Sequence, residues 1–253
     1  MTRGLALAVG FLTRLPIPAV DPDPIAVGRS LAWYPLVGAL IGALLAGAVA
    51  LLGFFLPAAP GVTAVLVVAL WVRVTGGLHL DGLADTADAA AAGGDRARRL
   101  AVLQDPRAGP AGVVAIVLVL LAKVAALTQL LQAGGAMIAL VIAPVIGRSL
   151  LVAAFLSTPY VRAGGLGEAL ARHHDRRACR AGLALTLVGI GVLAGPATAL
   201  VLVLSNAALL LYWRRGAMRD LGGCTGDLAG ALVEVGETLT LLGCVAVLAP
   251  AVR

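Results

Sequence analysis

The sequence predicts an all-α fold, a polytopic integral membrane helical bundle with about 6–7 transmembrane helices. Hydrophobic residues make up 60% of the 253-residue chain and charged residues only 13%, and the mean hydropathy is +1.01. Soluble domains carry roughly 25% charged residues. The apolar runs are continuous rather than alternating, which favours helices over a closed barrel. We expect a single integral membrane domain over residues 1–253.

The expected elements follow from the apolar runs in chain order. Met1–Leu15 has a basic start and an apolar run, and it predicts an interfacial or re-entrant helix. Gly195-Pro196 indicates a turn between two spans. Gly61–Val74 is short, and one option is that its helix continues through the acidic motif after it. A bilayer core about 30 Å thick needs about 20 apolar residues per helix, and the stretches that meet or approach this length are Leu36–Leu56, Gly61–Val74, Ala111–Leu131, Ala136–Leu156, Ala181–Ala194, Ala197–Trp213 and Leu239–Val252.

The basic residues alternate between loops. Arginines fill the loops 93–110 and 157–180 and the segment after Trp213, whereas the loops 57–60, 132–135 and 195–196 carry no charge. The positive-inside rule places the arginine-rich loops in the cytoplasm, together with the acidic motif. The net charge of +6 therefore suits anionic membrane lipid. We expect no nucleic-acid partner, because the chain has no soluble module large enough to bind one. A homo-oligomer remains an option, since the sequence does not decide the oligomeric state.

The stretch Gly76–Asp88 holds three carboxylates in a chain that otherwise avoids charge. At about 100° per residue, Asp81, Asp85 and Asp88 lie on one face of a helix. Three like charges within two turns repel one another unless a cation lies between them. Mg²⁺ prefers carboxylate oxygens and keeps open positions for phosphate, so the motif predicts a phosphate-handling metal site. Gly77 would allow a nucleotide to lie close to the backbone, and His79 adjoins the acidic face.

A second glycine-rich cluster, Gly222–Ala231, contains Asp227 and precedes Glu234. These two carboxylates are seven residues apart and share a helix face. Asp227 is either a helix N-cap or a further metal ligand, and Gly226 permits close approach of a ligand. Glu234 lies among apolar residues that enter the last span, and an ionisable group at membrane depth is a functional candidate.

Two cations complete the set of candidate residues. Lys123 is the only lysine in the chain and lies near the middle of an apolar span, so we expect it to pair with a carboxylate or a substrate phosphate. Arg107 lies in a turn specified by Asp105-Pro106 and neighbouring glycines. Its guanidinium would fork onto a phosphate, or else it is one more topology charge.

The motifs together resemble the cobalamin synthase (adenosylcobinamide-GDP ribazoletransferase) family nearly from end to end. His79–Thr86, with the letters HLDGLADT, is the most specific of them. The others are Phe11–Pro18, the rest of Gly76–Asp88, Asp105–Gly109 leading to Leu121–Lys123, Gly165–Gly167, Gly222–Asp227, Gly230-Ala231 and Glu234–Glu237.

This resemblance implies a transferase of the bacterial cytoplasmic (inner) membrane. Adenosylcobinamide-GDP and α-ribazole, or α-ribazole 5′-phosphate, would give adenosylcobalamin or its 5′-phosphate and GMP. We expect Mg²⁺ as the cofactor, held by Asp81, Asp85, Asp88 and Asp227 at the cytoplasmic face. The expected catalytic residues are Asp88, Lys123, Glu234 and His79, with Asp88, Glu234 or His79 as the proton acceptor. The expected substrate-binding residues are Arg107, Lys123, Gly77 and Gly226.

Two other functions are weighed against this one. An intramembrane aspartyl protease would use Asp81 and Asp227 as a carboxylate pair, but it has no use for a third aspartate on the helix or for Mg²⁺. An ion-coupled transporter would use Lys123 and Glu234 as a buried pair. Transporters commonly show inverted repeats, and the sequence has no visible internal symmetry.

Overall fold

The structure is a computed structural model that describes residues 2–18, 20–164 and 166–248. It is 82% helical, and the described part of the chain contains no β-strand, only an isolated bridge between Tyr160 and Cys224. The predicted all-α class is therefore confirmed.

Within these residues, six helical segments are long and apolar enough to cross a membrane, or seven if one bent pair counts as a span. The predicted range of six to seven spans is confirmed. Most boundaries lie within a few residues of those expected, because the apolar runs themselves set the helix lengths. The six segments are α2 (Pro24–Ser30) with the 3₁₀ turn η1 (Leu31–Trp33) and α3 (Tyr34–Phe55), α7 (Pro110–Ala133), α8 (Ala136–Ser157), α10 (Arg176–Ala194), α11 (Pro196–Leu221) and α12 (Gly226–Leu248).

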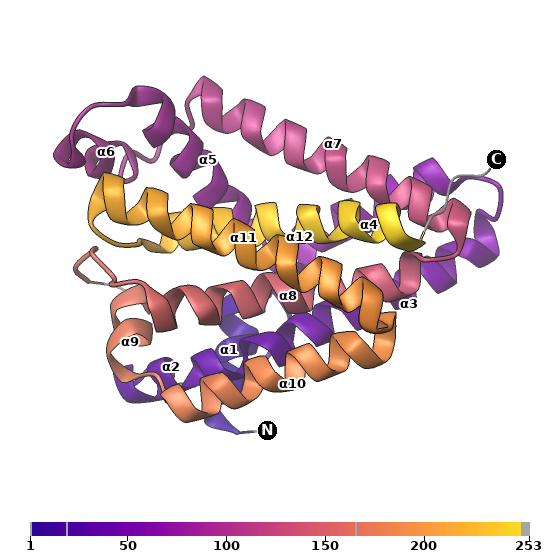
Figure 1. The fold of residues 1–253 in the computed structure, drawn as a ribbon, viewed down its shortest axis with the longest axis horizontal. Helices are drawn as coiled ribbons and strands as arrows, with labels where there is room; N and C mark the ends of the chain where they lie inside the picture. The colour runs from indigo at the N-terminus through magenta and orange to yellow at the C-terminus, as the bar shows by residue number, and fades with distance from the viewer. Residues whose placement is uncertain (1, 19, 165, 249–253) are drawn as a thin grey trace.

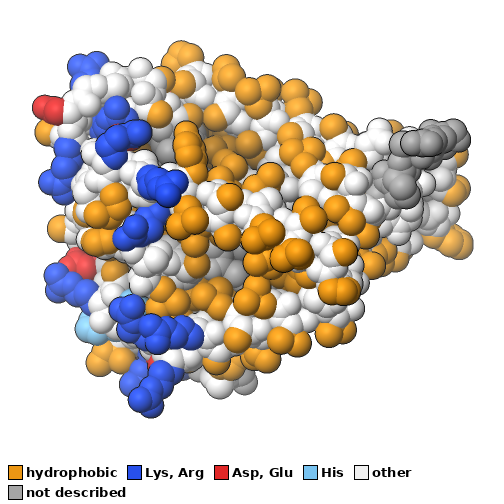
Figure 2. Space-filling view, viewed as in Figure 1, with side chains coloured by type: hydrophobic (Ala, Val, Ile, Leu, Met, Phe, Trp, Pro, Cys, Tyr) orange, Lys and Arg blue, Asp and Glu red, His pale blue; other side chains and the backbone are white. Residues whose placement is uncertain are grey.

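The long helices lie side by side, and the short helices gather at one end of the bundle (Figure 1). Those near this end include α2, α6 (Arg96–Val102) and α9 (Leu166–His173). Arginine side chains crowd the same end, whereas apolar side chains cover the rest of this face (Figure 2). We call it the arginine end. The helix α8 is the most buried span and packs against α3 and α12. Gly42 allows α3 to approach, since a Cβ there would lie 2.7 Å from the Leu140 carbonyl oxygen.

The predicted span Gly61–Val74 forms α4 (Pro60–Thr75), and the acidic motif forms a separate helix, α5 (Leu78–Ala92). The option of one continuous helix is wrong, because the two helices meet at 91°. Gly76 and Gly77 form the corner with φ of 66° and 69°. Only glycine adopts this left-handed conformation without steric cost. The corner turns α5 against α7 and α12.

The last helix starts earlier than expected. The predicted span Leu239–Val252 is the second half of α12, which already begins at Gly226, and residues 249–252 lie outside the described residues. The carboxylates of Glu234 and Glu237 do not end the span because buried cations pair with them. At the other terminus the expected helix is α1 (Arg3–Leu12), and its ten residues are too few to cross a bilayer core.

Candidate functional site

The contact between α5 and α12 builds the site. At Gly82 a Cβ would lie 2.7 Å from the backbone oxygen of Asp227, and at Gly230 it would lie 3.4 Å from the backbone of His79. The absence of these side chains lets the two helices touch along their backbones. The close approach brings the two acidic motifs of the sequence together, although they are far apart in the chain.

Four carboxylates lie near this contact, and we call them the acidic group: Asp81, Asp85, Asp88 and Asp227. Asp85 lies close enough to the other three to be repelled by each of them. Asp81 is exposed, and the others are partly buried. Only one arginine, Arg162, forms an ion pair with a member of the group among the described residues. The acidic group therefore keeps a large excess of negative charge, which favours binding of a cation.

Asp88 shares the predicted helix face but has a different environment. Its two carboxylate oxygens accept hydrogen bonds from the backbone N–H groups of Gly109 and Gly112, at 2.7 and 2.8 Å. Those groups belong to the N-terminus of α7, where a negative charge is stabilised. A Cβ at either glycine would lie 2.5 Å from an Asp88 oxygen. Through these two hydrogen bonds Asp88 holds the start of α7 against α5.

Asp227 pairs with Arg162, which lies in one of the arginine-rich loops. Arg162 Nη1 donates to Asp227 Oδ2 at 3.0 Å. Arg162 lies near Asp227 because its loop is hydrogen-bonded to the second glycine cluster. The backbone of Cys224 forms one hydrogen bond with Pro159 and one with Val161. Nothing in the sequence signals this pairing of two distant loops. Asp227 is not the N-cap of α12, since the Thr225 hydroxyl accepts the N–H of Leu228 instead.

A cavity of about 140 Å³ adjoins the acidic group, and we call it the α5–α12 cavity. Asp81 and Gly226 are its exposed members, whereas His79 and Leu151 are buried. His79 is 4% exposed, and within the described chain its Nδ1 is buried without a hydrogen-bond partner. The cavity is lined by Phe11, Tyr34, Leu78, His79, Asp81, Gly82, Leu151, Phe155, Gly167, Leu170, Gly226, Asp227, Ala229 and Gly230.

Lys123 and Glu234 meet inside the bundle. Lys123 Nζ lies 2.7 Å from Glu234 Oε2 and 2.6 Å from Glu237 Oε2, and 4.4 Å from the centre of the Trp71 ring. Arg148 pairs with the other oxygen of Glu237 and is fully buried. We call Lys123, Arg148, Glu234 and Glu237 the buried ion network. The expected pairing of Lys123 with a carboxylate is confirmed, and neither member of that pair lines the α5–α12 cavity.

The remaining candidate residues lie at the surface or in the backbone. The Arg107 side chain is 86% exposed and forms a two-pronged ion pair with Asp105. These hydrogen bonds lower the pKa of Asp105 to about 2, so its carboxylate is ionised near neutral pH. Gly77 ends the corner before α5, and Gly226 opens α12, where a Cβ would meet no atom within 4 Å.

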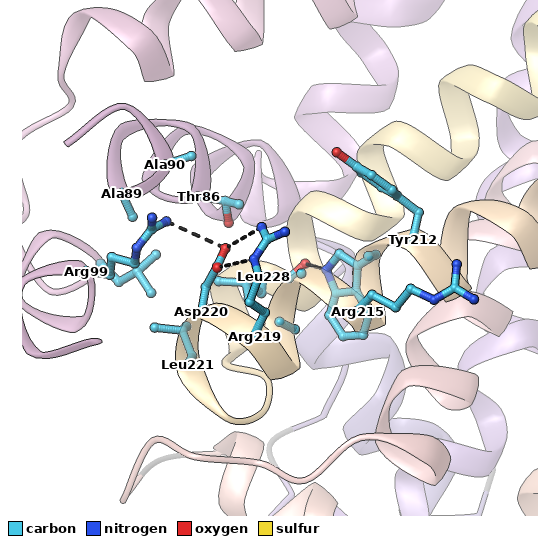
Figure 3. A pocket seen from close by; sticks show the side chains of 14 residues that line it. Thr86, Ala89, Ala90, Arg99, Tyr212, Arg215, Arg219, Asp220, Leu221 and Leu228 are labelled. Carbon is cyan, nitrogen blue, oxygen red and sulfur yellow. Dashed lines mark hydrogen bonds and ion pairs between the residues drawn. The ribbon is translucent and has the colours of Figure 1, made fainter. Parts of the chain in front are cut away.

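A second cavity of about 430 Å³ lies between α5, α6 and α11. Figure 3 shows Arg99 and Arg219 converging on Asp220, while the Arg215 side chain extends away from them. Tyr212 lines the same cavity and is 78% exposed. The arginines make this cavity suited to an anionic group.

The donor chemistry of the acidic group fits Mg²⁺, because all of its side chains are carboxylates. Among the described residues, no three carboxylates, imidazoles or thiols already converge as metal ligands. Two of the four carboxylates are held by other partners, Asp88 by backbone amides and Asp227 by Arg162. Asp81 and Asp85 have no ion pair among the described residues.

Comparison with known proteins identifies the family. The family model described as Cobalamin-5-phosphate synthase matches residues 4–245. A protein of Ectopseudomonas mendocina (strain ymp) named adenosylcobinamide-GDP ribazoletransferase is 52% identical over 244 residues, which cover 93% of this chain and 96% of that protein. A protein of the same name from Stutzerimonas stutzeri (strain A1501) is 50% identical over 242 residues, covering 94% of this chain and 96% of its own length. No solved structure gives a significant match. This chain therefore belongs to the cobalamin-5-phosphate synthase family.

Proposed function

We propose that this chain joins adenosylcobinamide-GDP to α-ribazole, or to α-ribazole 5′-phosphate, at a Mg²⁺ site formed by the acidic group. As a member of its family the chain is a membrane-bound transferase of cobalamin biosynthesis, and GMP is its second product. The observation that carries the metal site is the excess of carboxylate charge beside a cavity, where Arg162 is the only cation among the described residues that forms an ion pair with the acidic group.

Asp85 and Asp227 would hold the ion, with Asp81 beside them. Bound Mg²⁺ would neutralise the diphosphate and stabilise the charge that builds up as the phosphoryl group is transferred. Arg162 would release Asp227 on metal binding and contact the substrate phosphate, because its guanidinium lies next to the same carboxylate. Asp88 would position α5 against α7 through its two amide contacts.

The reaction needs an acceptor for one proton. A ribose hydroxyl oxygen of α-ribazole attacks the phosphorus attached to cobinamide, and the bond from that phosphorus to GMP breaks. GMP leaves with the electron pair, and the hydroxyl proton passes to a carboxylate. Asp81 suits this role because it is exposed and lines the cavity. The earlier candidates are engaged elsewhere, Asp88 by amides and Glu234 by Lys123, and His79 is buried.

The site would face the cytoplasm of a bacterial inner membrane. This orientation is supported by the arginine end (Figure 2), because basic loops remain on the cytoplasmic side. Soluble nucleotide substrates would reach the acidic group from that side. Anionic lipid would contact the exposed arginines there.

Neither rival function gains support from the relatives, which are named as transferases. The transporter interpretation uses Lys123 and Glu234 as a buried pair. In the structure, Glu237 and Arg148 enclose that pair in a network of two cations and two carboxylates. A balanced and fully buried network fits a structural role.

The test is a transfer assay on purified protein in lipid vesicles. Adenosylcobinamide-GDP and α-ribazole are supplied with graded Mg²⁺, and adenosylcobalamin and GMP are measured together. We expect equimolar products that disappear with a chelator and return with Mg²⁺. Asp85→Asn should lower turnover at least about 100-fold, since a metal-held charge is worth several kcal/mol. Asp21→Asn, a control at an exposed carboxylate that does not line the cavity, should leave turnover unchanged. Full activity in chelator would contradict the metal site.

A further inference from the structure

We propose that the α5–α12 cavity is the subsite for the dimethylbenzimidazole base of α-ribazole, and that His79 donates a hydrogen bond to the ring nitrogen of this base. The inference rests on the proposed function for the identity of the two substrates. The inference adds that the cavity binds α-ribazole, and that the His79 side chain recognises its base.

The size of the cavity limits what it can hold. Pockets that enclose a whole drug-sized ligand measure roughly 300–1,000 Å³. With about 140 Å³, the α5–α12 cavity takes one small ring system and not a whole nucleotide.

The two substrates carry two bases, the guanine of adenosylcobinamide-GDP and the dimethylbenzimidazole of α-ribazole. The polarity of the cavity walls favours one of them. The buried end is apolar and largely aromatic, with Tyr34, Leu151, Phe155 and Leu170 each at most 8% exposed. Guanine carries donors and acceptors on most of its edge, and these would lose their water partners at such walls. Dimethylbenzimidazole has a single acceptor nitrogen outside the sugar bond, and its methyl groups suit an apolar wall.

His79 supplies a matching group at the buried end. Its ring lines the cavity, and its Nδ1 has no hydrogen-bond partner in the described part of the chain. An imidazole ring carries at least one N–H donor whether it is neutral or protonated, and this donor complements the acceptor nitrogen of the base.

The orientation of the base agrees with the chemistry. With the ring at the buried end, the ribose must lie at the exposed end, beside Asp81 and Gly226. The attacking hydroxyl then lies next to the carboxylate that would accept its proton and next to the rest of the acidic group.

The experiment measures KM for each substrate separately in vesicles. His79→Phe should raise the KM for α-ribazole about 10-fold, the equivalent of one hydrogen bond, and leave the KM for adenosylcobinamide-GDP unchanged. An indole analogue of α-ribazole lacks the acceptor nitrogen, so it should be used equally well by His79→Phe and by the unchanged protein. An increase in KM confined to adenosylcobinamide-GDP would overturn the proposal. An equal rise in the KM of His79→Phe for α-ribazole and for its indole analogue would also overturn it.

A second variant keeps the test valid if His79→Phe does not fold. Gly230→Ala adds a methyl group 3.4 Å from the His79 backbone, an ordinary contact, at the point beside the cavity where α12 meets α5. It should raise the KM for α-ribazole more than the KM for the riboside of unmethylated benzimidazole. Gly189→Ala, whose Cβ meets nothing within 4 Å in α10, is the matched control. If Gly230→Ala affects both ribosides equally, the subsite is wrong, whereas absence of product from the unchanged protein would instead refute the proposed function.

Discussion

Removal of the Lys123 ammonium should destabilise the bundle before it affects chemistry. Lys123 Nζ serves two carboxylates at 2.7 and 2.6 Å, and the side chain is 4% exposed. Lys123→Met leaves one buried negative charge in excess, and breaking a buried pair costs about 3–5 kcal/mol. At roughly 2–4 °C per kcal/mol for a chain of this size, Tm should fall by on the order of 10 °C.

The double variant Lys123→Met with Glu234→Gln restores the balance of the buried ion network, and most of the lost stability should return. Thermal unfolding in lipid nanodiscs, followed by circular dichroism, measures Tm, and turnover is measured well below it. Arg73→Gln, at an exposed cation on α4, is the control. A Lys123→Met protein with unchanged Tm but no turnover would refute the structural role and return Lys123 to the substrate. A double variant as unstable as the single one would refute the charge argument.

The other predictions concern the margins of the site. Asp88→Asn loses one of two amide contacts, so the free energy of unfolding should fall by about 1–3 kcal/mol and the Gly109 loop should become open to proteolysis. Limited digestion measures this, and unchanged cleavage would contradict the positioning role. Arg107→Gln should change the KM of neither substrate by more than about twofold, since Asp105 already pairs with the guanidinium; a tenfold rise in either KM would show a phosphate contact. Arg162→Gln should tighten the apparent affinity for Mg²⁺ because it frees Asp227, yet lower kcat; a weaker Mg²⁺ affinity contradicts the proposed exchange of partners.

The spans and the acidic helix were predictable because their causes are local. Continuous apolar runs must form helices in lipid, and the spacing of Asp81, Asp85 and Asp88 places them on one face of a helix. The corner at Gly76 and Gly77 was not recognised, although two adjacent glycines are the signal for it. The predicted pairing of Lys123 also followed from burial alone, since a lone charge in a span must find a partner.

The rest depended on tertiary contacts that no single segment encodes. Asp88 shares the acidic face but points to the first turn of α7, which only the packing of α5 on α7 brings near. Arg162 reaches Asp227 through the Cys224 backbone contacts of a distant loop. The aromatic side chains of Tyr34 and Phe155 line the cavity from α3 and α8, and their positions in apolar spans look like ordinary core.

The most direct test of the central claim is metal binding itself. Mn²⁺ in place of Mg²⁺ gives an electron paramagnetic resonance signal that reports the bound ion without any substrate. The account predicts that the protein in nanodiscs binds Mn²⁺, that Asp85→Asn and Asp227→Asn each abolish this signal, and that Asp88→Asn retains it. Equal Mn²⁺ binding by all of these proteins would contradict a metal site in the acidic group.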